Sequence, residues 1–93
     1  MEKFSIESYD NFFRAVLKLR TLDDARKFFE DVCTIKELEA VSQRLEVAKM
    51  LKEGRSYLEI TAATGASTAT ISRVNKCLLY GDGGYNIVLG DKE

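Results

Sequence analysis

The sequence predicts an all-α protein that contains a helix-turn-helix. Three Ser or Thr residues are each followed three positions later by Asp or Glu, a spacing typical of capped helix starts. Apolar residues recur at helical spacing after these starts, and the chain has no proline. A glycine also separates two short helical patterns between residues 56 and 79. With 93 residues, we expect one domain.

The first half of the chain predicts three helices. Apolar residues repeat at helical spacing from about Ser5 to Arg20. Thr21 begins a second helix and Thr34 begins a long third one, because each can cap a helix N-terminus. Gly54 ends the third helix, since glycine readily adopts the left-handed conformation found at helix C-termini.

Residues 56–79 predict the helix-turn-helix itself. Ser56, with Glu59, starts the first helix, Gly65 ends it, and Ser67 caps the second. Glycine suits the turn because a tight turn there needs a left-handed backbone. Four apolar residues fall where the two helices must pack, and we expect them to be buried: Ile60, Ala66, Ile71 and Val74.

The outward positions of the second motif helix predict binding to double-stranded DNA. Their side chains are short, hydrogen-bonding or cationic, whereas a purely structural surface more often carries Glu, Lys and Gln. We expect Ser67, Thr68, Thr70 and Ser72 to read base edges, Ala69 to contact a thymine methyl group, and Arg55, Arg73 and Lys76 to bind phosphates, with Ser56 and Tyr57 completing the interface and Arg44 a further phosphate contact. The alternative is a helix-turn-helix that only packs.

The charge distribution agrees with DNA binding. The whole chain has a net charge of −1, but residues 41–80 carry six basic and three acidic residues. Attraction to phosphate depends on the local surface more than on the total charge. The excess is modest, so it predicts weak non-specific binding by one subunit and favours a dimer that uses two such surfaces.

The aromatic residues predict a homodimer. All five Phe residues lie within the first 29 positions. Two short helices and one long helix cannot easily bury so much aromatic area in a subunit of this size, and an exposed apolar patch is an association site. We expect the N-terminal helices to join two subunits. The alternative is a compact monomer with a Phe-rich core.

Several function classes are disfavoured by composition. The chain has no His, and its cysteines, Cys33 and Cys77, lack the close spacing of zinc or redox sites. We therefore expect no metal, no cofactor and no enzymatic activity. The sequence also shows no signal peptide and no apolar run long enough to cross a membrane, which predicts a cytoplasmic protein without a membrane partner.

The predicted organisation is a single helical domain over residues 1–80, followed by a tail over residues 81–93. Within the domain, residues 1–54 form dimerisation and scaffold helices, and residues 56–79 form the helix-turn-helix. The tail begins with turn-forming glycines. It is expected either to dock on the dimer or reach along DNA, or to be loosely ordered.

Residues 34–79 resemble the Trp repressor family. The likeness rests on the long helix from Thr34 through Arg44 to Gly54, and on the segment Gly65-Ala66-Ser67-Thr68-Ala69-Thr70-Ile71-Ser72-Arg73. The segment Ile-Ser-Arg-Val-Asn and the run Tyr-Gly-Asp-Gly-Gly-Tyr are similar to the YerC/YecD-type subfamily. The resemblance implies an intertwined, all-helical dimer. We expect a regulator of transcription, with repression favoured because the sequence shows no second domain that would sense a ligand or recruit polymerase.

The resemblance also implies an effector pocket. Arg44 and Arg73 match the arginines that hold the tryptophan corepressor, and Thr34 and Thr70 match residues that line its pocket. Val74 and Cys77, however, replace a glycine and a serine of that pocket. These changes argue against tryptophan, and both arginines could instead contact phosphates or pair with Glu side chains. Whether another small molecule binds stays open.

Other departures from the family affect the DNA surface and the C-terminus. Leu58 and Thr61 replace basic residues on the first motif helix, and the family's final helix is replaced by the Gly-rich tail. Two other functions therefore remain possible: a regulator that responds to an amino acid or indole, and a helical protein-interaction module that has lost DNA binding.

Overall fold

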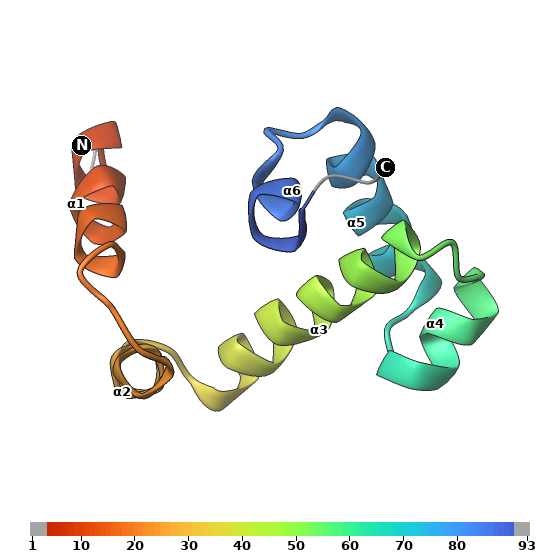
Figure 1. Ribbon diagram of the computed structural model, residues 1–93, viewed down its shortest axis with the longest axis horizontal. Coiled ribbons are helices and arrows are strands. Elements are labelled where there is room, and N and C mark those ends of the chain that lie inside the picture. Colours follow the sequence, from red (N-terminus) through yellow and green to blue (C-terminus); the bar gives the residue numbers. More distant parts are fainter. Residues whose placement is uncertain (1–3, 91–93) are drawn as a thin grey trace. The chain divides into compact units, whose positions relative to one another are not determined.

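The computed structural model describes residues 4–90, in which every regular element is an α-helix. The helices, shown in Figure 1, are α1 (Ile6–Val16), α2 (Leu22–Val32), α3 (Ile35–Lys52), α4 (Tyr57–Thr64), α5 (Thr68–Tyr80) and α6 (Gly84–Leu89). The predicted all-α class is confirmed. None of the helices in the described range is long and apolar enough to cross a membrane.

The chain forms two compact units, residues 1–35 and residues 36–93. In the first unit, Ser5 caps α1 and Thr21 caps α2, each accepting a hydrogen bond from the backbone N–H three residues later. Helix α1 ends earlier than the predicted Arg20. After Val16 the backbone hydrogen bonds of Lys18 and Leu19 join residues three apart instead of four. The Arg20 N–H then donates to the Asp24 carboxylate of the next helix.

The aromatic side chains of the first unit contact one another but stay partly open to solvent. Phe12 lies 5.9 Å from Phe28 and 6.4 Å from Phe29, measured between ring centroids. Neither α1 nor α2 contains a buried residue. Phe13 is 56% exposed, and Ile6 and Leu17 are about four-fifths exposed. This unit therefore presents an extensive apolar surface.

The second unit has a small, continuous core, built where α3, α4 and α5 meet (Figure 1). Val47, Ala48 and Met50 come from α3, and the predicted residues Ile60, Ala66, Ile71 and Val74 complete it, as expected. Burial of a Val or Ile side chain contributes roughly 1.5–3 kcal/mol, so this core fixes how α5 packs on α3 and α4.

The end of α3 is a Schellman motif, as the glycine predicted. Gly54 has a φ of 81°, in the left-handed region. Its N–H donates to the Leu51 carbonyl, and the N–H of Arg55 donates to the Met50 carbonyl at 3.1 Å. These bonds hold the short connection to α4, and they fix the backbone of Arg55 beside the first motif helix.

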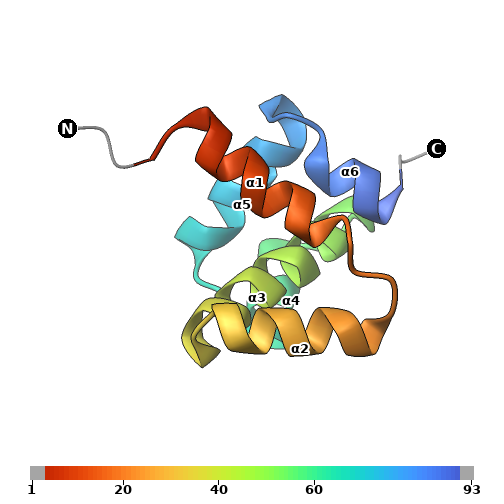
Figure 2. The same ribbon diagram turned by 90° about the vertical axis from the view of Figure 1, so that its left-hand side faces the viewer.

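The C-terminal segment differs from the expected Gly-rich tail because it contains α6. Tyr85 and Leu89, four residues apart on one face of α6, pack against the core. The Lys52 ammonium donates to the Asn86 side-chain oxygen at 2.6 Å, which joins α6 to the end of α3 (Figure 1 and Figure 2). The glycines do form a turn, as expected. The five residues after them form a helix, with the apolar residues Tyr85 and Leu89 spaced four positions apart. The last three residues of the predicted tail lie outside the described residues.

Gly81 is predicted to be essential for this turn. A Cβ atom on Gly81 would lie 2.5 Å from the Cys77 carbonyl oxygen, which also accepts the Gly81 N–H at 2.8 Å. We expect Gly81→Ala to lower the free energy of unfolding by about 1–3 kcal/mol, because backbone must move to relieve the overlap. Urea denaturation measures it.

Gly84→Ala is the matched control. A Cβ atom there meets nothing within 4 Å, and the residue begins α6. Alanine favours a helix over glycine, so the control should be neutral or slightly stabilising. Equal stability of the two variants would show that the Cys77 contact does not constrain residue 81.

Candidate nucleic-acid interface

The candidate interface includes the turn between α4 and α5, which several hydrogen bonds stabilise. Gly65 has a φ of 76°, as predicted for the turn, and its N–H donates to the Thr61 carbonyl. The Thr64 hydroxyl donates to the Ile60 carbonyl at 2.7 Å and accepts the N–H of Ala66 at 3.1 Å. The two helices therefore meet at a defined geometry.

The packing of α5 on the core determines which side chains of α5 are exposed to solvent. Ile71 and Val74 are buried, and the two residues between them, Ser72 and Arg73, are exposed. Of the predicted interface residues on or next to α5, those exposed are Ser67, Thr68, Ala69, Ser72, Arg73 and Lys76. The structure thus brings these six together on one helix surface.

Thr70 was expected to face outward, but the structure places it partly inside. It is half-buried, and its backbone N–H donates to the Ser67 hydroxyl at 3.1 Å. The two hydroxyl groups also lie 3.2 Å apart. Both side chains therefore take part in capping α5, which leaves Thr68 and Ser72 as the hydroxyls on this surface with no hydrogen bond to the described part of the chain.

The capping box at the start of α4 is complete, as predicted. The Glu59 N–H donates to the Ser56 hydroxyl at 3.1 Å, and the Ser56 N–H donates to the Glu59 carboxylate at 2.9 Å. This backbone bond lowers the pKa of Glu59, and the nearby Arg55 guanidinium lowers it further. Tyr57 lies at the first position of α4 with 36% of its surface exposed.

The predicted phosphate-binding cations fall into two groups. Arg73 and Lys76 are exposed, and neither forms an ion pair with any residue between 4 and 90. Arg55 instead lies between two carboxylates. Its guanidinium is 3.7 Å from Glu53 and 3.6 Å from Glu59. Only the first group is therefore immediately available to phosphate.

A cavity of about 560 Å³ lies beside α3, the end of α5 and α6. It brings together Arg44 and Cys77, which the pattern of the family placed at an effector pocket. Thr70 and Arg73 do not line it, and Thr34 belongs to the first unit. Val74 is buried in the core instead.

Two polar residues of this cavity were not predicted from the sequence, Asp82 and Tyr85. Both belong to the run Tyr-Gly-Asp-Gly-Gly-Tyr, which could have indicated a ligand site but which we interpreted as the start of a tail.

Comparison with known proteins identifies the family. The sequence profile of the Trp repressor protein family matches residues 7–93. The chain belongs to the Trp repressor family. This is a family of DNA-binding regulators and not of enzymes, so the expectation of a non-enzyme is confirmed.

Individual members of the Trp repressor family confirm the resemblance found in the sequence. The chain is 47% identical over 89 residues to the uncharacterized protein YerC of Bacillus subtilis (strain 168), covering 96% of this chain and 86% of YerC. A TrpR-like protein from Eubacterium eligens ATCC 27750 is 57% identical, with a TM-score of 0.87 over 92% of this chain and 89% of that one. A candidate Trp repressor from Staphylococcus aureus is 44% identical, with a TM-score of 0.86 over 91% and 85%.

Proposed function

We propose that this protein is a sequence-specific regulator of transcription that binds double-stranded DNA as a homodimer. One observation carries the proposal: a rigidly capped helix-turn-helix exposes short polar and basic side chains on the side of α5 opposite its buried residues. Such a helix fits the major groove and can present these groups to base edges. Repression is the proposed outcome because the family is that of the Trp repressor.

Within this interface, the proposed roles follow from exposure and hydrogen bonding. Thr68 and Ser72 read base edges, directly or through water, and Ala69 contacts a thymine methyl group. Arg73 and Lys76 bind phosphates and set the orientation of the helix. Ser67 and Thr70 support this arrangement from the helix cap, where any base contact must share their hydroxyl groups.

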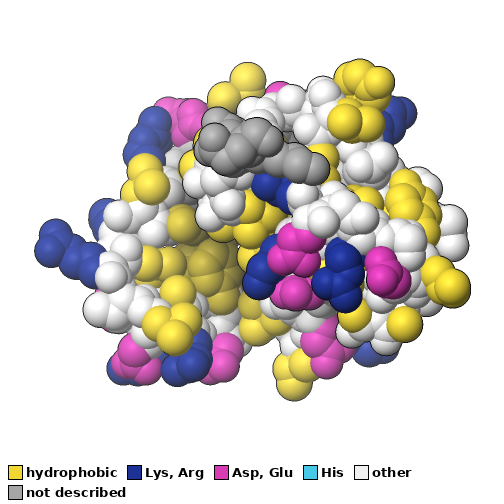
Figure 3. All heavy atoms as spheres, turned by 45° about the vertical axis from the view of Figure 1, so that its right-hand side comes forward, with side chains coloured by type: hydrophobic (Ala, Val, Ile, Leu, Met, Phe, Trp, Pro, Cys, Tyr) yellow, Lys and Arg dark blue, Asp and Glu magenta, His cyan; other side chains and the backbone are white. Residues whose placement is uncertain are grey.

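The homodimer is supported by the apolar residues that the chain leaves exposed. Hydrophobic side chains reach the surface in several places (Figure 3). The exposed hydrophobic residues of the N-terminal helices include Tyr9, Phe13 and Leu22. A second copy of the chain would remove such surface from water. Two recognition helices in one dimer would enter successive major grooves, roughly 34 Å apart.

Selection from random duplex DNA tests the proposed function. We expect the purified protein at low salt to enrich a two-fold symmetric motif, with half-sites about one helical turn apart, because the dimer presents two equivalent helices. Sequencing of the bound DNA measures it. A folded dimer that enriches no motif, and whose weak binding does not depend on salt, would instead support a protein-interaction module.

Lys76→Ala should weaken binding to all sequences about equally. The side chain is exposed and unpaired within the described residues, so its loss removes a phosphate contact without removing base readout. We expect the slope of log affinity against log salt to flatten by about one per subunit. Fluorescence anisotropy at several salt concentrations measures the slope.

The matched control is Lys36→Ala, which removes the same charge near the start of α3 and outside the proposed interface. It should leave the slope close to that of the native protein. An unchanged slope in Lys76→Ala would remove Lys76 from the phosphate contacts.

The cavity favours a second function, control by a small molecule. Its lining combines a cation, Arg44, and an acid, Asp82, with apolar residues that include Val41, Leu45 and Val88. An apolar amino acid has complementary groups for all three: its carboxylate for Arg44, its ammonium for Asp82 and its side chain for the apolar residues. An indole carboxylate complements Arg44 and the apolar residues. Calorimetry against a panel of such compounds should give binding that Arg44→Ala weakens at least tenfold, because the carboxylate loses its charged partner. Heat that Arg44→Ala does not change would exclude this cavity.

A further inference from the structure

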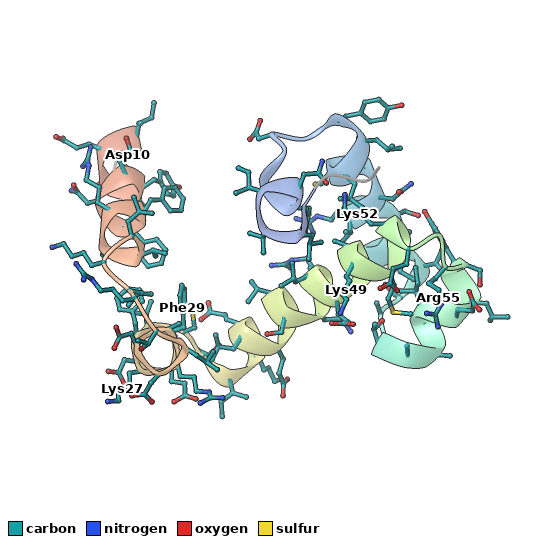
Figure 4. All side chains as sticks on the ribbon, in the orientation of Figure 1. Asp10, Lys27, Phe29, Lys49, Lys52 and Arg55 are labelled. Carbon is teal, nitrogen blue, oxygen red and sulfur yellow. The ribbon has the colours of Figure 1, made fainter. Side chains whose placement is uncertain are left out.

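Arg55 holds a distinct position among the basic residues of the second unit. It lies in the connection between α3 and α4, next to the first motif helix (Figure 4). Its backbone N–H is bound to the Met50 carbonyl, and the next residue, Ser56, caps α4. The start of its side chain is therefore fixed relative to the helix-turn-helix.

Two carboxylates flank the Arg55 guanidinium. Glu53 Oε1 lies 3.7 Å from Nη1, and Glu59 Oε1 lies 3.6 Å from Nε. The Glu59 oxygen is the same atom that accepts the Ser56 N–H at 2.9 Å, so capping holds it in place. The pairing consequently follows from how α4 begins. Arg73 and Lys76 have no such partner among residues 4–90.

We propose that Glu53 and Glu59 form an acidic clamp that holds Arg55 back from DNA phosphates and so weakens non-specific binding. This inference rests on the proposed function in DNA binding. The three side chains together carry a net negative charge, although a basic surface is what draws a protein to DNA of any sequence.

The acidic clamp has a consequence for specificity. All three side chains are about half exposed, and an exposed ion pair is weak. A well-placed phosphate on the correct site can therefore displace the carboxylates, whereas a passing contact with random DNA gains little from Arg55. The clamp lowers the non-specific background against which a specific site must compete.

Glu59→Gln is the variant that opens the acidic clamp. Glutamine also completes a capping box, so α4 should keep its start while the negative charge is lost. We expect this variant to bind a random-sequence 20-base-pair duplex about three- to tenfold more tightly than the native protein at 50 mM salt. The salt slope should steepen by about one per subunit, because Arg55 now contacts phosphate. Fluorescence anisotropy between 50 and 200 mM salt measures both.

Glu39→Gln is the matched control. It makes the same change in net charge near the start of α3. Glu39 lies about 20 Å along this helix from its C-terminal end, which Arg55 follows. That distance exceeds the screening length at these salt concentrations, so this variant should leave Arg55 paired and should not steepen the salt slope. Glu53→Gln lies outside the capping box and opens the other side of the clamp. It should also tighten binding, and it covers the case in which Glu59→Gln disturbs folding.

A double-variant cycle separates the acidic clamp from simple repulsion between Glu59 and DNA. Arg55→Ala alone should change affinity by less than twofold, because the clamped side chain contributes little. In the Glu59→Gln background, Arg55→Ala should abolish the gain. A gain that persists without Arg55 would overturn the clamp, and so would equal salt slopes for the native protein and both glutamine variants. Absence of DNA binding by every variant would overturn the proposed function itself, and the clamp with it.

Discussion

The arrangement of the helix-turn-helix depends on one cluster of apolar contacts. Ile60 from α4 and Ile71 and Val74 from α5 are buried with Val47 and Ala48 of α3. Because a helix turns by about 100° per residue, burying two residues of α5 decides which of its other residues meet solvent. The polar surface of α5 is therefore a consequence of the core, and any shift in this packing would rotate that surface.

Helix capping uses several of the polar groups that we propose for the DNA interface. Ser67 accepts a backbone hydrogen bond that starts α5, and Thr70 lies against it. Ser56 and Glu59 do the same for α4, and Glu59 in addition faces Arg55. Groups that stabilise the helix ends are less available to DNA. The proposed recognition surface is therefore small. It relies on Thr68, Ser72 and two cations, Arg73 and Lys76, that form no ion pair among residues 4–90.

The C-terminal segment forms one side of a cavity that the helix-turn-helix motif alone does not predict. Helix α6 packs on the same core through Tyr85 and Leu89, and the turn before it passes close to the end of α5 at Cys77. The cavity beside Arg44 arises from this return of the chain. The last turn of α5, which includes Cys77, thus lines the cavity, while the first turns of the same helix carry the proposed DNA interface.

The sequence by itself determined the helical class, the caps at Ser56 and Ser67, the turn at Gly65 and the buried residues of the motif. The caps and the turn depend on neighbours within about four residues, and the apolar spacing that identifies the buried positions is also a local pattern. Tertiary structure alone decided that residues 84–89 form a helix, that Thr70 turns toward the cap, and that Arg44 shares a cavity with Asp82. Packing against distant residues sets such properties, and burial then overrides what a local pattern favours. The pairing of Arg55 lies between these cases, since its partners are near in sequence but its geometry required both helix ends to be in place.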